Sequence, residues 1–291
     1  MPLFRERARA KINLTLTVNG RRTDGYHDLL SLVAFADAGD TVTLDTGAPT
    51  GTTVTGPFAS AIEGPNLVET ALGRVAELVP GLTIGHVSIE KNLPVASGMG
   101  GGSSDAAAAL RAIRSAHPAE TAGLDWNDLC AGLGADVPVC FAGEATWMSG
   151  TGARLHPLTL PLPKLDAVLI NPGETIPSDK TARVFRALAA PPLNEGSTAH
   201  AALPALHDRE ALLAVMRRTG NDLESPATAV IPAIDEVLSA LEACPDAMLA
   251  RLSGAGPTCF AIFDGAAAAQ SAAAALKSAH PSWWIVPAVL Q

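Results

Sequence analysis

A run of glycines between a predicted strand and a predicted helix constrains the fold of this chain more than any other feature. Residues 86–95, HVSIEKNLPV, have the pattern of a strand and lead directly into SGMGGGSSDAA and an alanine-rich run. Alanine is the best helix former, so this run predicts a helix that ends before Pro118. The fold must therefore place a strand, a glycine loop and a helix in that order.

The glycine loop has the composition of a polyphosphate site. Its glycines allow positive φ angles and close backbone approach, so successive N–H groups can converge on an anion, and the helix start adds partial positive charge. The alternative is a flexible turn capped by Ser104 or Asp105. The predicted nucleotide-binding residues are Pro94, Val95, Ala96, Ser97, Gly98, Met99, Gly100, Gly101, Gly102, Ser103 and Ser104.

This loop differs from the two best-known nucleotide signatures. No Gly-Lys-Ser/Thr follows it, as in a Walker A motif, and it is not the G-x-G-x-x-G of a dinucleotide fold. The positive charge that a polyphosphate needs must therefore come from another part of the chain.

Length and composition indicate a globular protein of two domains. The chain has 291 residues, 48% of them hydrophobic and 17% charged, and one hydrophobic core rarely extends over so many residues. A net charge of −9 disfavours binding to nucleic acid or to an anionic membrane. The four cysteines form no Cys-x-x-Cys pair, and no apolar segment has the length of a membrane span, so we expect a reduced, cytoplasmic protein.

Hydrophobic periodicity predicts a mixture of helices and strands, an α+β class. A proline-rich bend at residues 157–163 predicts a boundary between domains 1–160 and 161–291. Residues 191–204 have no apolar period and are predicted to be a loop. The other predicted elements are strands 8–18, 29–35, 40–46 and 166–171 and a helix over 66–79 that Asn66 caps.

Four segments together resemble the GHMP kinase family. PVASGMGGGSSDAA is similar to the family's phosphate-binding motif, in the triple-glycine form of its members that act on a diphosphocytidyl alcohol. ARAKINLTL, GADVPVC and SGAGPTCF, at residues 8–16, 134–140 and 253–260, are similar to its other motifs, and they follow in the same order. The resemblance implies an N-terminal domain like the second domain of ribosomal protein S5 and a ferredoxin-like C-terminal domain.

The resemblance implies catalytic roles for Lys11 and Asp136, without a covalent phosphoenzyme. Independently, a carboxylate such as Asp136 suits the general base that a substrate alcohol needs. An ammonium such as Lys11 would keep that carboxylate ionised and offset charge on the transferred phosphoryl group. Asn13 shares the polar face of the predicted strand with Lys11, and we include it among the substrate-binding residues.

The resemblance also implies a cytosine site in RTDGYHDL, residues 22–29, where Tyr26 would stack on the base and His27 would hydrogen-bond to it. TARVF, residues 181–185, is similar to a segment that faces the substrate, which adds Thr181 and Phe185, although the preceding IPSDK departs from the family pattern. The glycines of SGAGPTCF are expected to form a wall against the first glycine loop. Taken alone, RTDGYHDL and SGAGPTCF could each be an ordinary turn.

The predicted activity is ATP-dependent phosphorylation of a small-molecule alcohol in isoprenoid precursor synthesis. ATP is the expected co-substrate, Mg²⁺ the metal that accompanies it, and the partners are small molecules. The sequence does not indicate the metal ligands or the oligomeric state. A homoserine, mevalonate or sugar kinase of the same family is the nearest alternative, and a non-catalytic S5-like binding protein is a more distant one.

Overall fold

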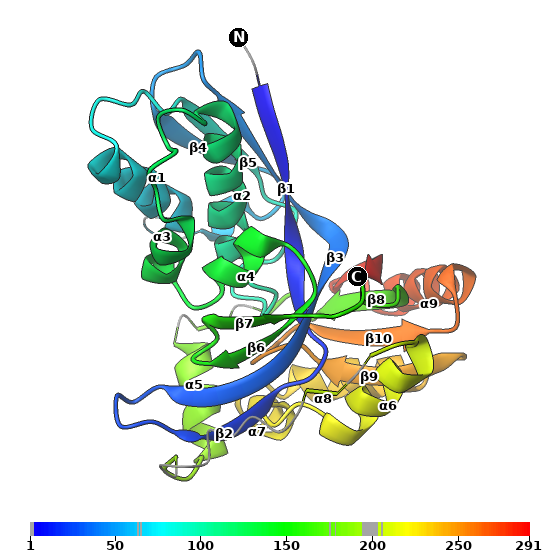
Figure 1. Cartoon of the computed structure of the whole chain (residues 1–291). Helices are drawn as coiled ribbons and strands as arrows, with labels where there is room; N and C mark the ends of the chain where they lie inside the picture. The colour runs from blue at the N-terminus through cyan, green and yellow to red at the C-terminus, as the bar shows by residue number, and fades with distance from the viewer. Residues whose placement is uncertain are drawn as a thin grey trace. The chain divides into compact units, whose positions relative to one another are not determined.

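The computed structural model describes residues 3–62, 64, 66–174, 176–177, 179–193, 203–204 and 206–291 (Figure 1). Helices and strands are mixed along the chain, which confirms the predicted α+β class. The elements are β1 Leu3–Asn13, β2 Thr17–Arg21, β3 His27–Asp45, β4 Gly51–Thr55, the 3₁₀ helix η1 Ala59–Ala61, α1 Leu67–Leu78, β5 His86–Glu90, α2 Gly101–Ala116, α3 Trp126–Leu133, α4 Val137–Ala142, β6 Thr146–Gly150, β7 Arg154–Pro157, β8 Leu165–Asn171, α5 Lys180–Leu188, α6 Arg209–Thr219, α7 Glu224–Val230, α8 Ala233–Glu242, β9 Ala247–Leu252, β10 Cys259–Phe263, α9 Ala266–Ala279 and β11 Trp284–Leu290.

The chain forms two compact units, and each unit contains separate stretches of sequence. The first unit comprises Met1–Ala10, Ala38–Val95 and Gly100–Gly143, and the second comprises the remaining three stretches. Strands β1 and β3 each contribute residues to both units, as does the glycine loop between β5 and α2.

In the first unit a small sheet packs with helices α1 to α4. Strand β5 pairs antiparallel with the second half of β3, and β4 pairs parallel with β5. Helices α1, α2 and α3 lie on one side of these strands (Figure 1). The Asn66 side chain accepts the N–H of Glu69 at 3.0 Å, which confirms the predicted cap of α1. Alanines of α2 are buried, so the helix can pack closely against its neighbours.

The second unit contains a four-stranded antiparallel arrangement in the order β11-β8-β10-β9. Along the chain these elements follow as a strand, helices, two strands, a helix and a strand, which is the ferredoxin-like pattern. Helices α8 and α9 pack against these strands, and their buried residues join one hydrophobic core. The predicted ferredoxin-like C-terminal domain is confirmed.

The first half of β3 carries further strands of the second unit. Strand β2 pairs with it from Thr17 to Arg21, and β6 pairs with it from Thr146 to Gly150. Strand β7 then pairs with β6. All three pairings are antiparallel, so this part of the unit is built from hairpin-like neighbours.

Three predicted element boundaries were wrong. Strands predicted over 29–35 and 40–46 form the single strand β3, because Gly39 makes a close approach between strands and not a turn. A Cβ atom at Gly39 would lie 2.4 Å from the carbonyl oxygen of Ala8. The strand predicted over 8–18 ends at Asn13, and the strand predicted over 86–95 ends at Glu90.

Part of the predicted loop over residues 191–204 lies outside the described residues. Within the described part of the chain, every helix is too short or too polar to cross a bilayer.

Candidate active site

In the first unit, the second half of the glycine loop becomes the start of α2. Gly100 has φ of +63° and caps the helix, and Gly101 and Gly102 lie in its first turn. The first N–H groups of a helix have no acceptor within the helix, so this turn can donate to an anion. Ser104 uses its hydroxyl to donate to the carbonyl oxygen of Arg9 at 2.7 Å. Its backbone N–H donates to the carbonyl oxygen of Gly100 at 2.8 Å, so both donors of Ser104 are already engaged within the structure.

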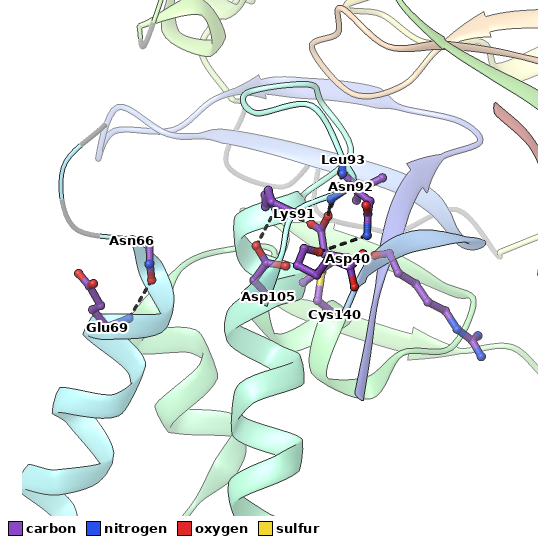
Figure 2. Close-up of polar contacts among 11 residues, drawn as sticks. Asp40, Asn66, Glu69, Lys91, Asn92, Leu93, Asp105 and Cys140 are labelled. Atoms are coloured by element: carbon purple, nitrogen blue, oxygen red, sulfur yellow. Dashed lines mark hydrogen bonds and ion pairs between the residues drawn. The ribbon is translucent and has the colours of Figure 1, made fainter. Parts of the chain in front are cut away.

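Three buried charged side chains meet in the same unit (Figure 2). The ammonium of Lys91 donates to Oδ2 of Asp40 and, at 2.6 Å, to Oδ2 of Asp105. The second oxygen of Asp40 accepts the N–H groups of Asn92 and Leu93 at 2.5 and 2.8 Å. This buried charge cluster, Asp40, Lys91 and Asp105, joins β3, the segment after β5 and the first turns of α2.

Full ionisation of this cluster would leave an excess of buried negative charge. Burial lowers the pKa of Lys91, but the two carboxylates outweigh burial and raise that pKa above its ordinary value. Burial raises the pKa of Asp105 to about 8, although Lys91 acts in the opposite direction. Asp105 is therefore protonated at neutral pH, and its Oδ1 atom is buried without a hydrogen-bond partner in the described structure.

The buried charge cluster lies directly beside the predicted phosphate site. A Cβ atom at Gly101 would lie 3.3 Å from Nζ of Lys91. The ion pair therefore contacts the first turn of α2, where the first N–H groups have no acceptor within the helix. With Asp105 protonated, the cluster does not add negative charge next to that anion.

In the second unit, the first half of the glycine loop meets the segment SGAGPTCF at Gly98. Gly98 has φ of +82°, and a Cβ atom there would lie 2.7 Å from the carbonyl oxygen of Gly256 and 2.8 Å from that of Ser253. The Ser253 hydroxyl donates to the carbonyl oxygen of Gly98 at 3.2 Å, and the N–H of Thr258 donates to that of Ser97 at 3.0 Å. Residues 97–98 and the loop 253–258 are thus in close contact, and only a glycine fits at position 98. We call this contact the Gly98 corner.

The end of β1 brings Lys11 and Asn13 to this corner. The backbone N–H of Lys11 donates to the carbonyl oxygen of Met99 at 2.9 Å, and that of Asn13 donates to the Ser253 hydroxyl at 3.2 Å. The Asn13 side chain donates to Ser31 at 2.7 Å. Both residues are buried, although their strand was predicted to expose a polar face. A lysine is rarely buried unless it is paired, so Lys11 differs from the exposed lysine that an ordinary strand would carry.

The second unit also pairs two of the predicted acceptor residues. The rings of His27 and Phe185 are stacked, with centroids 4.5 Å apart and an angle of 24° between planes. Burial, followed by the charge of Arg21, lowers the pKa of His27, so its ring is neutral near pH 7 and can both donate and accept a hydrogen bond. Tyr26 is 66% exposed, and Thr181 is also exposed. The Tyr26 ring is therefore open to a ligand.

Asp136 lies in the first unit, immediately before α4. It is half-buried, and its carbonyl oxygen accepts the N–H of Cys140 at 3.1 Å. Helix α4 packs against α2, whose first turn contains the predicted phosphate donors. The local fold thus holds the Asp136 backbone at the start of a short helix.

Sequence reasoning missed two buried lysines, Lys91 and Lys180. Lys91 lies within the stretch taken as a strand, and its carboxylate partners are distant in sequence. Lys180 begins α5, is 4% exposed and donates to the carbonyl oxygen of Gly256. A lysine in the first turn of a helix is unfavourable for the helix dipole, and this was the available signal for Lys180.

Comparisons with known proteins match both halves of the chain to one family. The description "GHMP kinases N terminal domain" matches residues 66–144, and "GHMP kinases C terminal" matches residues 200–282. A protein of Rhodopseudomonas palustris strain BisA53 named 4-diphosphocytidyl-2-C-methyl-D-erythritol kinase is 46% identical over 288 residues. The alignment covers 96% of this chain and 95% of that protein.

Solved structures agree with these matches. A crystal structure of 4-(cytidine 5'-diphospho)-2C-methyl-D-erythritol kinase has a TM-score of 0.76 and 32% identity, with 98% of each chain covered. A homoserine kinase from Cytophaga hutchinsonii has a TM-score of 0.62 at 17% identity, covering 100% of this chain and 95% of the other. At that identity the second likeness shows a shared fold alone. These matches confirm the two-domain GHMP kinase fold.

Proposed function

Because the chain belongs to the GHMP kinase family, we propose that it transfers the γ-phosphoryl group of ATP to the 2-hydroxyl of 4-diphosphocytidyl-2-C-methyl-D-erythritol. This reaction is a step of non-mevalonate isoprenoid precursor synthesis. The observation that carries the proposal is the 46% identity, over nearly the whole of both chains, to a relative named for this substrate. All four cysteines have free thiols, which suits the cytoplasmic setting that we include in the proposal.

An assay of ADP release tests the proposed substrate directly. The purified chain would receive ATP with the cytidylyl acceptor, homoserine, mevalonate or galactose in separate reactions. We expect turnover with the cytidylyl acceptor to exceed that with each of the others. Preferred turnover of homoserine, mevalonate or galactose would overturn the substrate assignment while leaving the kinase family intact.

We propose that Mg²⁺ enters as the complex with ATP. Among the described residues there is no group of three or more His, Cys, Asp or Glu side chains that could hold a metal ion. This fits Mg²⁺, which keeps several waters and binds largely through substrate phosphates. Bound to ATP, the ion would offset negative charge on the phosphates, and we assign no side chain to it.

The ATP phosphates are proposed to bind the backbone of residues 98–104. Positive φ at Gly98 and Gly100 and the first N–H groups of α2 support this assignment. The remaining proposed nucleotide-binding residues, from Pro94 to Ser104, shape the same loop.

Replacing Gly102 by valine should weaken ATP binding by at least roughly tenfold and leave the fold intact. A Cβ atom at Gly102 would meet no atom of other parts of the chain within 4 Å, so the protein itself should tolerate the side chain, which would occupy space proposed for a phosphate. Calorimetric titration with ATP measures the effect. Gly73→Val is the matched control, because Gly73 is also helical, belongs to the same unit and has open space around it. Equal ATP affinity in Gly102→Val and Gly73→Val would show that the first turn of α2 does not bind the nucleotide.

The acceptor is proposed to bind through Asn13, Tyr26, His27, Thr181 and Phe185 of the second unit. Support comes from the stack of His27 on Phe185 and from the exposed ring of Tyr26. A neutral imidazole can exchange hydrogen bonds with the edge of cytosine, and an aromatic ring can stack on its face. Together these groups would select a base, which phosphate contacts cannot do.

Replacing Tyr26 by alanine should raise KM for the cytidylyl acceptor and leave KM for ATP nearly unchanged. Loss of base stacking costs about 1 to 3 kcal/mol, which corresponds to roughly 5- to 150-fold in KM. Steady-state kinetics with each substrate varied in turn measures the difference. Tyr26→Phe keeps the ring and should behave like the parent. An equal rise for both substrates would show that Tyr26 does not recognise the base.

For the chemical step, we propose that Asp136 accepts the proton of the acceptor hydroxyl while its oxygen attacks the γ-phosphorus in line. The bond between that phosphorus and the bridging oxygen of ADP breaks, and ADP leaves with the electron pair. Lys11 is proposed as the electrostatic partner of this step, offsetting the charge that grows on the transferred group. The reaction then needs no covalent phosphoenzyme.

A further inference from the structure

The Lys180 side chain hydrogen-bonds to the loop 253–258, which contacts Gly98. Its ammonium donates to the carbonyl oxygen of Gly256 and lies 3.5 Å from that of Ala255. The Gly256 carbonyl is the atom closest to the position that a Cβ of Gly98 would occupy, at 2.7 Å. A direct chain of contacts therefore leads from α5, through the loop, to the first half of the proposed phosphate-binding segment.

The charge of Lys180 is not neutralised by any carboxylate of the described structure. On its own helix, Asp179 is paired with Arg183, and Arg186 adds further positive charge. On α7, which packs against α5, the carboxylate of Glu224 accepts the N–H of Leu252 at 2.8 Å. The contacted loop, residues 253–258, has no titratable side chain.

This ammonium is unfavourable for the stability of the fold. Burial lowers the pKa of Lys180 to about 8, because the charged form loses its hydration. The positive end of the α5 dipole disfavours it further. A neutral apolar side chain of similar size would avoid both penalties but would lose the hydrogen bond to the Gly256 carbonyl, so what the lysine supplies here is the contact with this loop.

We propose that Lys180 is a positioning residue for ATP, which fixes the Gly98 corner of the phosphate-binding loop through the carbonyl groups of Ala255 and Gly256. This inference rests on the proposed function of that loop. The ammonium also brings a positive charge that no carboxylate of the described structure neutralises close to a segment proposed to bind a polyanion. The proposed phosphate-binding loop, residues 94–104, contains no lysine of its own.

Two consequences distinguish this role from a purely structural one. First, removing the ammonium should change ATP affinity more than KM for the acceptor. Second, a bound polyanion should favour the charged form of Lys180, so ATP binding near pH 8 should be accompanied by proton uptake. A side chain that only supports the fold would produce neither effect.

The test is calorimetric titration of ATP into the parent and the Lys180→Met variant. At about pH 7 we expect the variant to bind ATP roughly tenfold more weakly, the scale of one hydrogen bond to a charged group. Between about pH 7 and 9.5 the parent should lose more affinity than the variant, because only the parent loses the charge of Lys180. Titration of Asp105 contributes equally to both proteins and cancels in the comparison. Lys277→Met, an exposed lysine of α9 in the same unit, is the matched control.

Stability measurements show whether the variant is comparable with the parent. The folded pKa of Lys180 is below the ordinary value of 10.5, so between about 8 and 10.5 the unfolded chain binds more protons. The free energy of unfolding of the parent should therefore rise with pH in this window, relative to Lys180→Met. If Lys180→Met does not fold, Lys180→Gln keeps an N–H donor without the charge and should also lose the pH dependence.

Parent-like ATP affinity at both pH values in a folded variant would overturn the inference. A raised KM for the acceptor with unchanged ATP affinity would overturn it as well. Failure of the proposed function is a separate result, because the parent would then bind ATP with the predicted pH dependence and still not turn over the cytidylyl acceptor.

Discussion

Replacing Asp136 by asparagine should lower kcat by roughly 10² to 10⁴, the usual contribution of general acid–base catalysis. Asparagine keeps the size of the side chain and much of its hydrogen bonding but cannot accept the proton of the acceptor hydroxyl. Affinity for ATP should change little, because the loss falls on the transition state. Steady-state ADP release and calorimetric titration with ATP measure the two quantities.

Asp128→Asn is the matched control for this result. Asp128 is an exposed carboxylate on α3 of the same unit, and its replacement should leave kcat near the parent value. Lys11→Met should also be slow. If the two proposed catalytic residues act as one unit, the double variant should be little slower than the poorer single variant. A folded Asp136→Asn enzyme that turns over at the parent rate would show that Asp136 is not the general base.

Replacing Lys91 by methionine should destabilise the fold by about 3 to 5 kcal/mol, the usual effect of breaking a buried ion pair. The Lys91 side chain is 4% exposed and that of Asp40 is 0% exposed, so the remaining carboxylate could not regain its hydration. Urea unfolding near pH 7, followed by circular dichroism, measures the change in free energy.

Two variants act as controls for Lys91. Arg74→Met breaks the exposed pair between Arg74 and Glu77 and should cost less than about 1 kcal/mol. Asp105→Asn should cost less than Lys91→Met, because Asp105 is already protonated at pH 7. A loss below about 1 kcal/mol for Lys91→Met would show that the cluster does not support the fold.

The pH dependence provides a second measurement on this cluster. The pKa of Asp105 is raised from 3.8 to about 8 in the folded state, so between these values the folded protein binds more protons than the unfolded chain. Stability should therefore fall as pH rises through this window. Asp105→Asn removes the titrating group and should flatten that slope.

Local sequence rules predicted the elements whose signals are local. The Asn66 cap and the alanine-rich α2 depend on neighbouring residues, and both were confirmed. The continuity of β3 depends on a close contact between Gly39 and Ala8, which are distant in sequence. From the sequence alone, a glycine between two apolar runs indicates a turn more readily than such a contact. The predicted domain boundary near residue 160 stays a prediction.

The candidate site likewise has features that the sequence could indicate and features that only the fold brings together. Motif resemblance pointed to Lys11, Asp136 and the glycine loop as candidate site residues, because these segments keep a recognisable order along the chain, and their roles stay predictions. It could not identify Lys91 or Lys180 as buried, since burial comes from residues that the fold brings from other segments. The stack of His27 on Phe185 likewise joins two segments that were predicted separately.

The division of β1 and β3 between the two units sets an order of completion during synthesis. Every stretch of the first unit has left the ribosome once Gly143 has emerged, so that unit can fold while the rest of the chain is still being made. The second unit includes Lys11–Asp37 but also needs β11, whose Leu290 pairs with Ala36. A fragment that starts at Glu144 would lack the strand residues of Lys11–Asp37, which belong to the second unit, and we expect it to fail to fold by itself. The segment that carries Lys11 must therefore wait for the C-terminus before its own unit can close.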